Sequence, residues 1–217
     1  VRNSAVIKFE GRIHEQIGKS IEDAGYSIVG SDITIRHYGY LNPSPDKIER
    51  NKELLLKEIE EHPYDPWLKY HLGETEFAAG NTQGAKKIFM DLIPGSGSQY
   101  FINNVQNSDG NILESYGNHW LELSSAQREM VLIRLSQVAL KEEKYDELEK
   151  FSAFSSHDTN REGLRLFIKA TGALMQGKYN EASQLYTATE VQFSTLIDKN
   201  QVRLALELIH KIQANQM

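Results

Sequence analysis

The stretch GKYNEASQLYTAT, residues 177–189, decides how most of this chain is expected to fold. After the opening glycine, Ala182, Leu185, Tyr186 and Thr189 follow the i, i+3, i+4, i+7 spacing of one helix face. A small residue first lets this helix approach a neighbour closely, and the larger tyrosine fills the groove against the next pair of helices. The stretch therefore predicts the second helix of a helical hairpin that stacks on other hairpins.

Two further copies of this hairpin pattern occur upstream. One turns at Gly80, and the other turns at Glu143, with Leu148 where an alanine is expected. Glu143 and Gly177 lie 34 positions apart, whereas Gly80 and Glu143 are separated by slightly less than two such periods. A degenerate unit is therefore expected around residues 100–123.

These hairpins resemble tetratricopeptide repeats, whose period is 34 residues. The resemblance implies a mainly α fold, in which residues 64–217 form an α-solenoid of helical hairpins. The match is incomplete, because Trp67 and Tyr70 flank the position of the usual early aromatic. An irregular helical bundle with chance spacing is the alternative. A last amphipathic helix over 198–214 is expected to cap the stack with a polar outer face, and its apolar side carries Val202, Ala205, Leu206 and Ile209.

Residues 1–43 differ from the rest because they mix β-branched runs with glycines. Strands are predicted at residues 5–9, 26–29 and 32–37. A short helix is predicted over 14–24, and Gly25 is placed to end it in a left-handed cap. A piece of this size leaves sheet edges and one face uncovered. We therefore expect a small α/β remnant of a larger sheet.

A connecting helix is expected over residues 44–63. Ser44 can cap it, Pro45 suits its first turn, and Pro63 stops it. Asp65 is followed by a second proline, which repeats the start signal for the next helix. Three regions are thus predicted, at residues 1–43, 44–63 and 64–217.

The composition limits the classes of function. The 217 residues carry 24 Lys and Arg against 30 Asp and Glu, and the net charge of -6 argues against non-specific nucleic-acid binding. The absence of cysteine excludes disulfides and thiolate metal sites, and it fits a reducing compartment. No apolar run approaches the roughly 20 residues of a membrane span. We expect a soluble, cytoplasmic protein.

Candidate chemistry lies near the start of the chain. His14 and Glu15 follow a glycine at the predicted helix start, and His37 ends a predicted strand. Strand ends and helix starts collect ligand-binding groups in open α/β sheets, and a carboxylate beside an imidazole can act as a general base or form part of a hard-metal site. A purely structural role is the alternative, because the helix dipole alone favours an acidic residue such as Glu15 in a first turn.

Four stretches taken in order resemble the rear portion of bacterial family 2 glycosyltransferases that carry C-terminal tetratricopeptide repeats. They are FEGRIHEQI (9–17), DITIRHYGY (32–40), KIERNKELLLKEI (47–59) and HPYDPWLKYHLGE (62–74). The resemblance covers roughly residues 2–93, and the repeats continue it to the end. It implies a type A glycosyltransferase fold that transfers sugar from a nucleotide-sugar donor, with a divalent metal held partly by an Asp-any-Asp motif.

The resemblance also implies roles for three residues. Glu15 becomes a candidate base for an acceptor hydroxyl, His14 a residue that shapes the acceptor pocket, and His37 a cofactor-binding candidate near the donor diphosphate and metal. The chain departs from the family because the nucleotide-binding half and the Asp-any-Asp motif are missing. We therefore expect no metal ligands and no cofactor in this chain, and no catalysis by it alone.

Two other functions remain open. A non-catalytic repeat scaffold would bind a protein or peptide in its groove, and residues 1–43 would then only cap the solenoid. A hydrolase using Glu15 and His14 would need a nucleophile or a metal that the sequence does not offer. Polar residues on the first helices of the repeats are candidates to line the groove, namely Lys69, Glu76, Arg165 and Lys169. Trp67 and Trp120 are expected to pack at hairpin seams.

Overall fold

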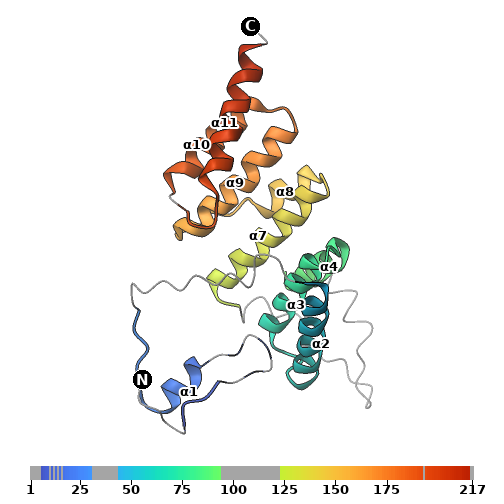
Figure 1. Cartoon of the computed structure of the whole chain (residues 1–217), viewed down its shortest axis with the longest axis vertical. Helices are drawn as coiled ribbons and strands as arrows, with labels where there is room; N and C mark the ends of the chain where they lie inside the picture. Colours follow the sequence, from blue (N-terminus) through green and yellow to red (C-terminus); the bar gives the residue numbers. More distant parts are fainter. Residues whose placement is uncertain are drawn as a thin grey trace. The chain divides into compact units, whose positions relative to one another are not determined.

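The computed structural model describes residues 6–9, 11, 13, 15, 17–30, 44–93, 123–192 and 194–215 (Figure 1). Nine helices lie in these ranges: α1 Gly18–Asp23, α2 Pro45–Glu61, α3 Pro66–Ala78, α4 Thr82–Asp91, α7 Ser125–Lys141, α8 Tyr145–Phe151, α9 Thr159–Met175, α10 Tyr179–Val191 and α11 Lys199–Ala214. No strand occurs within them. The described chain is therefore mainly helical, and it divides into two compact units, Val1–Ile88 and Phe89–Met217.

The first described segment is held by a serine hydroxyl and forms no strand. Ser20, the buried residue of α1, accepts from the Lys8 amide at 3.1 Å and donates to the Lys8 carbonyl at 2.7 Å. These bonds satisfy at Lys8 the backbone groups that a neighbouring strand would otherwise pair. Residues 26–30 likewise form no strand. The strands predicted at 5–9 and 26–29 are absent from the described residues, and the strand at 32–37 lies outside them.

The short helix α1 begins later than its sequence pattern indicated. It was predicted over 14–24 and occupies Gly18–Asp23, and its N-cap residue Ile17 makes no side-chain cap. Gly25, with φ of 79°, ends it as expected, because the amides of Gly25 and Tyr26 bond back into the last turn.

The caps predicted for α2 and α3 are confirmed. Ser44 accepts a hydrogen bond from the amide of Lys47 at 3.3 Å, and the Asp65 carboxylate accepts from the amide of Trp67 at 2.8 Å. His62 ends α2, just before the proline. The two helices pack against each other, and Leu55 on α2 is fully buried.

Three turns share one geometry, as the repeat spacing indicated. Gly80, Glu143 and Gly177 all have positive φ, of 82°, 56° and 71°. At each turn, this residue and the next donate amide hydrogen bonds to carbonyls of the last turn of the preceding helix, at 2.9–3.1 Å. This arrangement is the Schellman motif, which reverses the chain into the following helix. The sequence-equivalent turns are therefore structurally equivalent.

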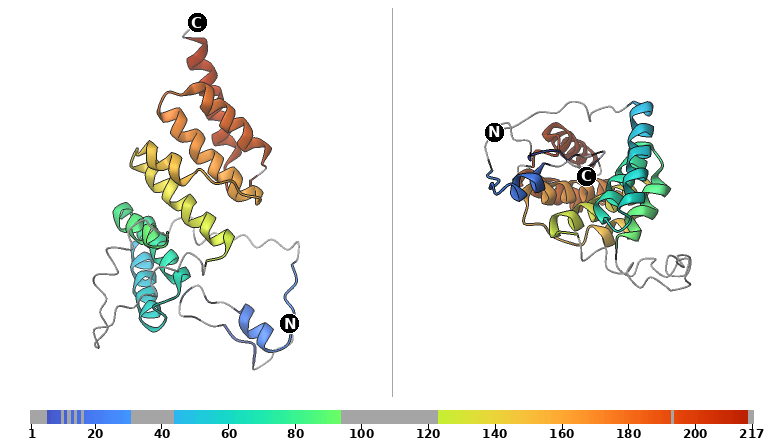
Figure 2. Two further views of the ribbon diagram at one scale, coloured as in Figure 1. Left: turned by 180° about the vertical axis from the view of Figure 1, so that it is seen from behind. Right: turned by 90° about the horizontal axis from the view of Figure 1, so that it is seen from below.

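The second unit is built from helical hairpins. α7 packs against α8, α9 against α10, and α7 also packs against α9 (Figure 1). α10 in turn contacts α11, and the orange and red helices gather in one group in both views of Figure 2. One core cluster joins these last three helices, through Ala170, Ala173, Ala182, Tyr186, Val202 and Ile209.

Leu148, which stands where the hairpin pattern expects an alanine, packs against a glycine of the next helix. Leu148 on α8 is buried. Its Cδ2 atom lies so close to Gly172 of α9 that a Cβ there would be only 2.3 Å away. The bulk added on one helix is thus offset by a glycine on the other. Tyr186, expected in the groove towards the next hairpin, also contacts its own, because its hydroxyl lies 3.0 Å from the Thr171 hydroxyl of α9.

The final helix differs from the expected polar cap. α11 buries Val202 and Ile209 as predicted, but its outer side exposes Leu204 and Leu208, at 55% and 49%. These leucines are four positions apart, so they lie on one side of the helix. The outer side of α11 is therefore partly apolar.

Candidate functional site

Glu15 is the candidate catalytic residue that the structure describes. It precedes α1 and does not belong to its first turn, so the helix dipole does not account for its position. Gly11, with φ of 96°, opens a tight loop in which an added Cβ would lie 3.8 Å from the Glu15 Cα. The Glu15 side chain is exposed. It is accessible to a substrate hydroxyl, as a general base must be.

The two candidate histidines, His14 and His37, lie outside the described residues, as does Trp120. Their grouping with Glu15 therefore stays a prediction.

Glu76, a predicted groove residue, instead binds within its own unit. Only 8% of it is exposed, and its carboxylate contacts the Lys52 ammonium of α2 at 2.8 Å and the Asn81 amide at 2.8 Å. Burial raises the pKa of Glu76, but the hydrogen bonds from Lys52 and Asn81 outweigh it, so this pKa lies below its usual value. The hydrogen bond that the Lys52 ammonium donates to Glu76 raises the pKa of Lys52. Glu76 thus joins α2 to α3.

Arg165 and Lys169 also have partners within the second unit. Arg165 forms a two-point contact with Glu162, at 2.9 and 2.5 Å, and donates to the Ser152 carbonyl at 2.9 Å. Lys169 pairs with Glu149 of α8 at 3.1 Å. These side chains connect α9 to the preceding hairpin. A ligand would have to compete with these contacts.

The segment between α8 and α9, residues 152–158, is held by two carboxylates, and we call it the strap. Glu129 of α7 accepts from the Ser156 hydroxyl at 2.6 Å and from Arg161 at 2.5 Å. Glu162 accepts from the Ser156 amide at 2.9 Å. Burial raises the pKa of Glu162, but the hydrogen bonds from Arg165 and Ser156 outweigh it and leave this pKa lowered.

No local sequence signal points to the role of Glu129. The nearby Asp158 is a recognisable helix cap, and it does accept from the Arg161 amide at 2.9 Å. That signal locates the start of α9. It does not reveal that the Arg161 side chain reaches a carboxylate 32 positions earlier.

Trp67 packs against aromatic side chains of its own helix, α3, and its place at a hairpin seam stays a prediction. Its ring is stacked on Tyr70, with centroids 4.3 Å apart and planes within 2°. His71 meets the same indole edge-on, at 4.7 Å. Tyr70 is buried, so this aromatic group belongs to the packing of the first unit.

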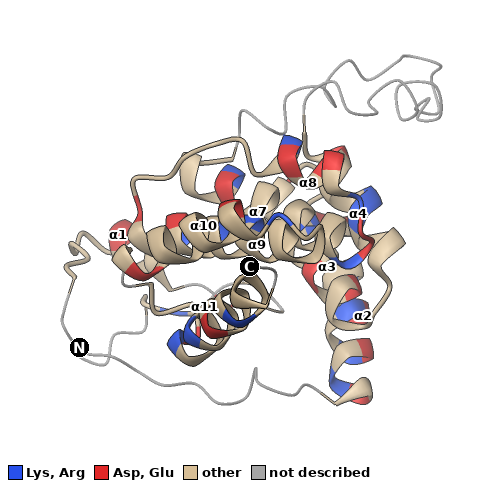
Figure 3. Cartoon of the chain, turned by 90° about the horizontal axis from the view of Figure 1, so that it is seen from above, with Lys and Arg blue, Asp and Glu red and all other residues tan. Residues whose placement is uncertain are grey.

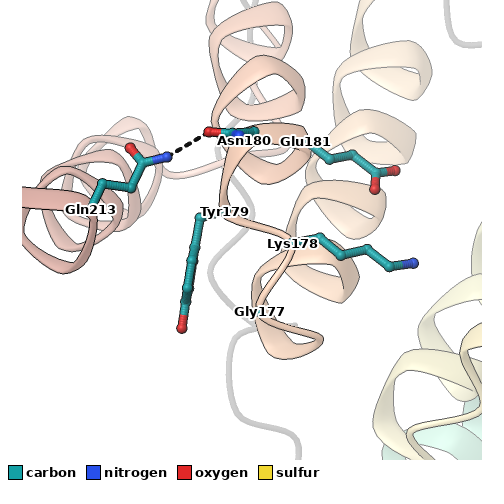
Figure 4. Close-up of a pocket in the computed structure, with 6 residues that line it drawn as sticks. All are labelled: Gly177, Lys178, Tyr179, Asn180, Glu181 and Gln213. Atoms are coloured by element: carbon teal, nitrogen blue, oxygen red, sulfur yellow. Dashed lines mark hydrogen bonds between the residues drawn. The ribbon is translucent and has the colours of Figure 1, made fainter. Parts of the chain in front are cut away.

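Hollows in the described part of the second unit include two of different size. The larger, about 350 Å³, surrounds the α9–α10 turn and is lined by Gly177, Lys178, Tyr179, Asn180, Glu181 and Gln213. In Figure 4, Asn180 and Gln213 point towards one another and share a 2.7 Å hydrogen bond. The smaller, about 200 Å³, lies by Thr189, Ser194 and Val202. Glu15 is not among the residues that line either of them.

No three His, Asp or Glu side chains among the described residues gather as metal ligands would. None of the helices that the structure describes has the length and apolar character to cross a membrane.

Comparisons of the chain with models of protein families, with curated proteins and with solved structures return no match.

Proposed function

We propose that this chain is the C-terminal region of a family 2-like glycosyltransferase. Residues 1–43 would be the acceptor-side remnant of a type A α/β domain, and tetratricopeptide-like repeats would bind the acceptor or a partner protein. Glu15 would deprotonate the acceptor hydroxyl, His14 would shape the acceptor pocket, and His37 would lie near the donor diphosphate and its metal. The proposal includes a cytoplasmic location.

The observation that carries the proposal is the order of its parts. The paired elements FEGRIHEQI and DITIRHYGY precede a capped helix and then hairpins with equivalent turns. The exposure of Glu15 and of the apolar side chains of Phe9, Ile28 and Val29 supports a segment that another part of a domain covers.

The coding sequence upstream of Val1 tests this proposal. We expect an in-frame segment with a βαβ pattern and an Asp-any-Asp motif. An in-frame stop codon directly before Val1 would contradict it. Residues 1–217 alone should release no nucleoside diphosphate from nucleotide sugars above the buffer rate, because the donor-binding half is not among them. Turnover by this purified chain would also contradict the proposal.

The role of Glu15 is tested in the longer protein. Replacing a general base, as in Glu15→Gln, should lower the transfer rate by about 100- to 10,000-fold. Glu22→Gln is the matched control, because Glu22 is an exposed carboxylate on the same segment. Equal rates for the two variants would remove Glu15 from the mechanism.

The second candidate is a non-catalytic scaffold that binds a peptide. The common core of α9, α10 and α11, and the packing of α7 on α8 and α9, favour it, because this packing needs no α/β domain. Peptide selection against the full chain should then yield one consensus motif that binds saturably. Binding of that motif with no donor turnover in the longer protein would favour the scaffold over the transferase.

A further inference from the structure

The outer side of α11 differs from its inner side in a specific way. Val202 and Ile209 on the inner side are 2% and 0% exposed. On the outer side, Leu204 and Leu208 stand one turn apart and are about half exposed. Single exposed leucines are ordinary, but the last helix of a repeat stack normally carries a polar outer face. This adjacent pair therefore needs an account of its own.

Charges of both signs flank the two leucines. Arg203 and Glu207 lie on one border of the pair and contact each other at 2.5 Å, and both side chains remain about half exposed. Figure 3 shows basic and acidic residues next to one another along α11. This charged border is self-complementary in an antiparallel pair of helices. Reversing the direction of one helix exchanges the positions of its positive and negative charge, so each charge faces the opposite one.

We propose that the outer side of α11 binds the same side of a second copy of this chain, with the two helices antiparallel. A twofold axis that crosses the outer side of α11 midway between Leu204 and Leu208 sets Leu204 against Leu208 of the second copy. It also brings Arg203 beside Glu207 of the second copy. A twofold axis makes each contact occur twice, which is the isologous interface of most homodimers.

The charge order selects this occupant over an unrelated helix. An unrelated apolar helix would need only the leucines, whereas a second antiparallel copy also places opposite charges together on the border. The surface is small, so we expect weak and concentration-dependent association. This proposal goes beyond the proposed function and does not depend on it.

Sedimentation equilibrium of the full chain, from micromolar to near-millimolar concentration, tests the proposal. We expect a monomer–dimer equilibrium. The double variant Leu204→Glu with Leu208→Glu should lose the dimer. Leu56→Glu, which changes an exposed leucine on α2, should leave it unchanged and serves as the control. A chain that is monomeric throughout would overturn the proposal.

Charge reversal separates this interface from any other dimer. Arg203→Glu and Glu207→Arg should each weaken self-association about tenfold, because like charges then meet twice. Mixing the two variants should restore association as a heterodimer, since every border contact then joins opposite charges. Unchanged self-association in the single variants, or no recovery on mixing, would overturn the antiparallel pairing. Circular dichroism of each variant checks that the helices remain folded.

Discussion

The three turns between paired helices, at Gly80, Glu143 and Gly177, have similar backbone conformations. Glycine occupies the position of positive φ in two of them, and glutamate in the third. Glu143 takes φ of 56° where Gly80 and Gly177 take 82° and 71°. A side chain at this conformation is strained, by roughly 1 kcal/mol or slightly more. The repeat spacing therefore identifies a position where the natural residue is not the most stable one.

The strain at Glu143 gives the first prediction. Glu143→Gly should raise the free energy of unfolding by about 1 kcal/mol, since glycine adopts this conformation freely. Gly177→Ala, the reverse change at the equivalent turn, should lower it by about the same amount. Urea unfolding followed by circular dichroism measures both. A loss of stability in the glycine variant would show that the Glu143 side chain contributes more than its strain costs.

Residue-level signals predicted some features well and others poorly. The caps at Ser44 and Asp65 and the stop at Gly25 are local, because donor and acceptor lie within three positions or the conformation is set by one residue. The start of α1 was wrong by four residues. The residue before the observed helix, Ile17, has no side chain that could cap it, so no local signal marks this start.

The contact between α8 and α9 depends on a matched pair of residues. A Cβ at Gly172 would lie 2.3 Å from the Leu148 Cδ2 atom, and Leu148 is buried, so it has little room to move. Leu148 departs from the repeat pattern in the sequence itself. Its connection with Gly172 cannot be read there, because only the packed structure brings the two residues together.

Gly172→Ala should therefore destabilise the protein by about 1–3 kcal/mol, although alanine is the better helix former. Leu148→Ala should cost about 2–5 kcal/mol through the cavity it leaves. The double variant should be more stable than the sum of the two losses implies, because the new methyl group enters that cavity. A double-mutant cycle by urea unfolding measures this coupling. Strict additivity would contradict the match.

Glu162 makes the attachment of the strap to α9 sensitive to acid. Its pKa in the folded protein is lowered, so its contribution to stability is present above the unfolded carboxyl value, about 4.3, and is lost as pH falls through the folded value. Glu162→Gln should flatten the dependence of unfolding free energy on pH below about 4.3. Arg165→Met, which removes a main partner, should flatten it as well. A full acid slope in both variants would contradict this account.

At the scale of the molecule, the first described segment contributes little to the packed core. Among the described residues from 6 to 30, only Ser20 is buried, and Val29 is 80% exposed. Removing residues 1–30 should change the free energy of unfolding by less than about 1 kcal/mol. Urea unfolding of residues 31–217 beside the full chain measures this. A larger loss would show that the segment takes part in the cooperative fold.

The mainly helical fold was predictable because its signals repeat. The turns at Glu143 and Gly177 follow the same helix–turn–helix pattern, and the same cap-and-proline signal occurs at Ser44 and Asp65. Each occurrence of a signal supports the interpretation of the other. The strand predicted at residues 5–9 was wrong, because β-branched composition does not supply a neighbouring strand, and Ser20 satisfies the Lys8 backbone instead. The candidate site was selected from its expected places at a helix start and a strand end, and the family resemblance then gave its residues their roles. The structure adds the exposed position of Glu15.

The strap has a kinetic consequence. Ser156 is tied by its amide to Glu162 and by its hydroxyl to Glu129, so the link between two hairpins is anchored on both sides. Two hairpins joined by a loose linker can unfold one at a time. Here the strap is hydrogen-bonded to both hairpins, so the unfolding of either one breaks a hydrogen bond that anchors the strap to it and loosens its link to the other. The amide proton of Ser156 should consequently exchange with deuterium slowly, at the pace of the interior of α9, despite its place outside any helix.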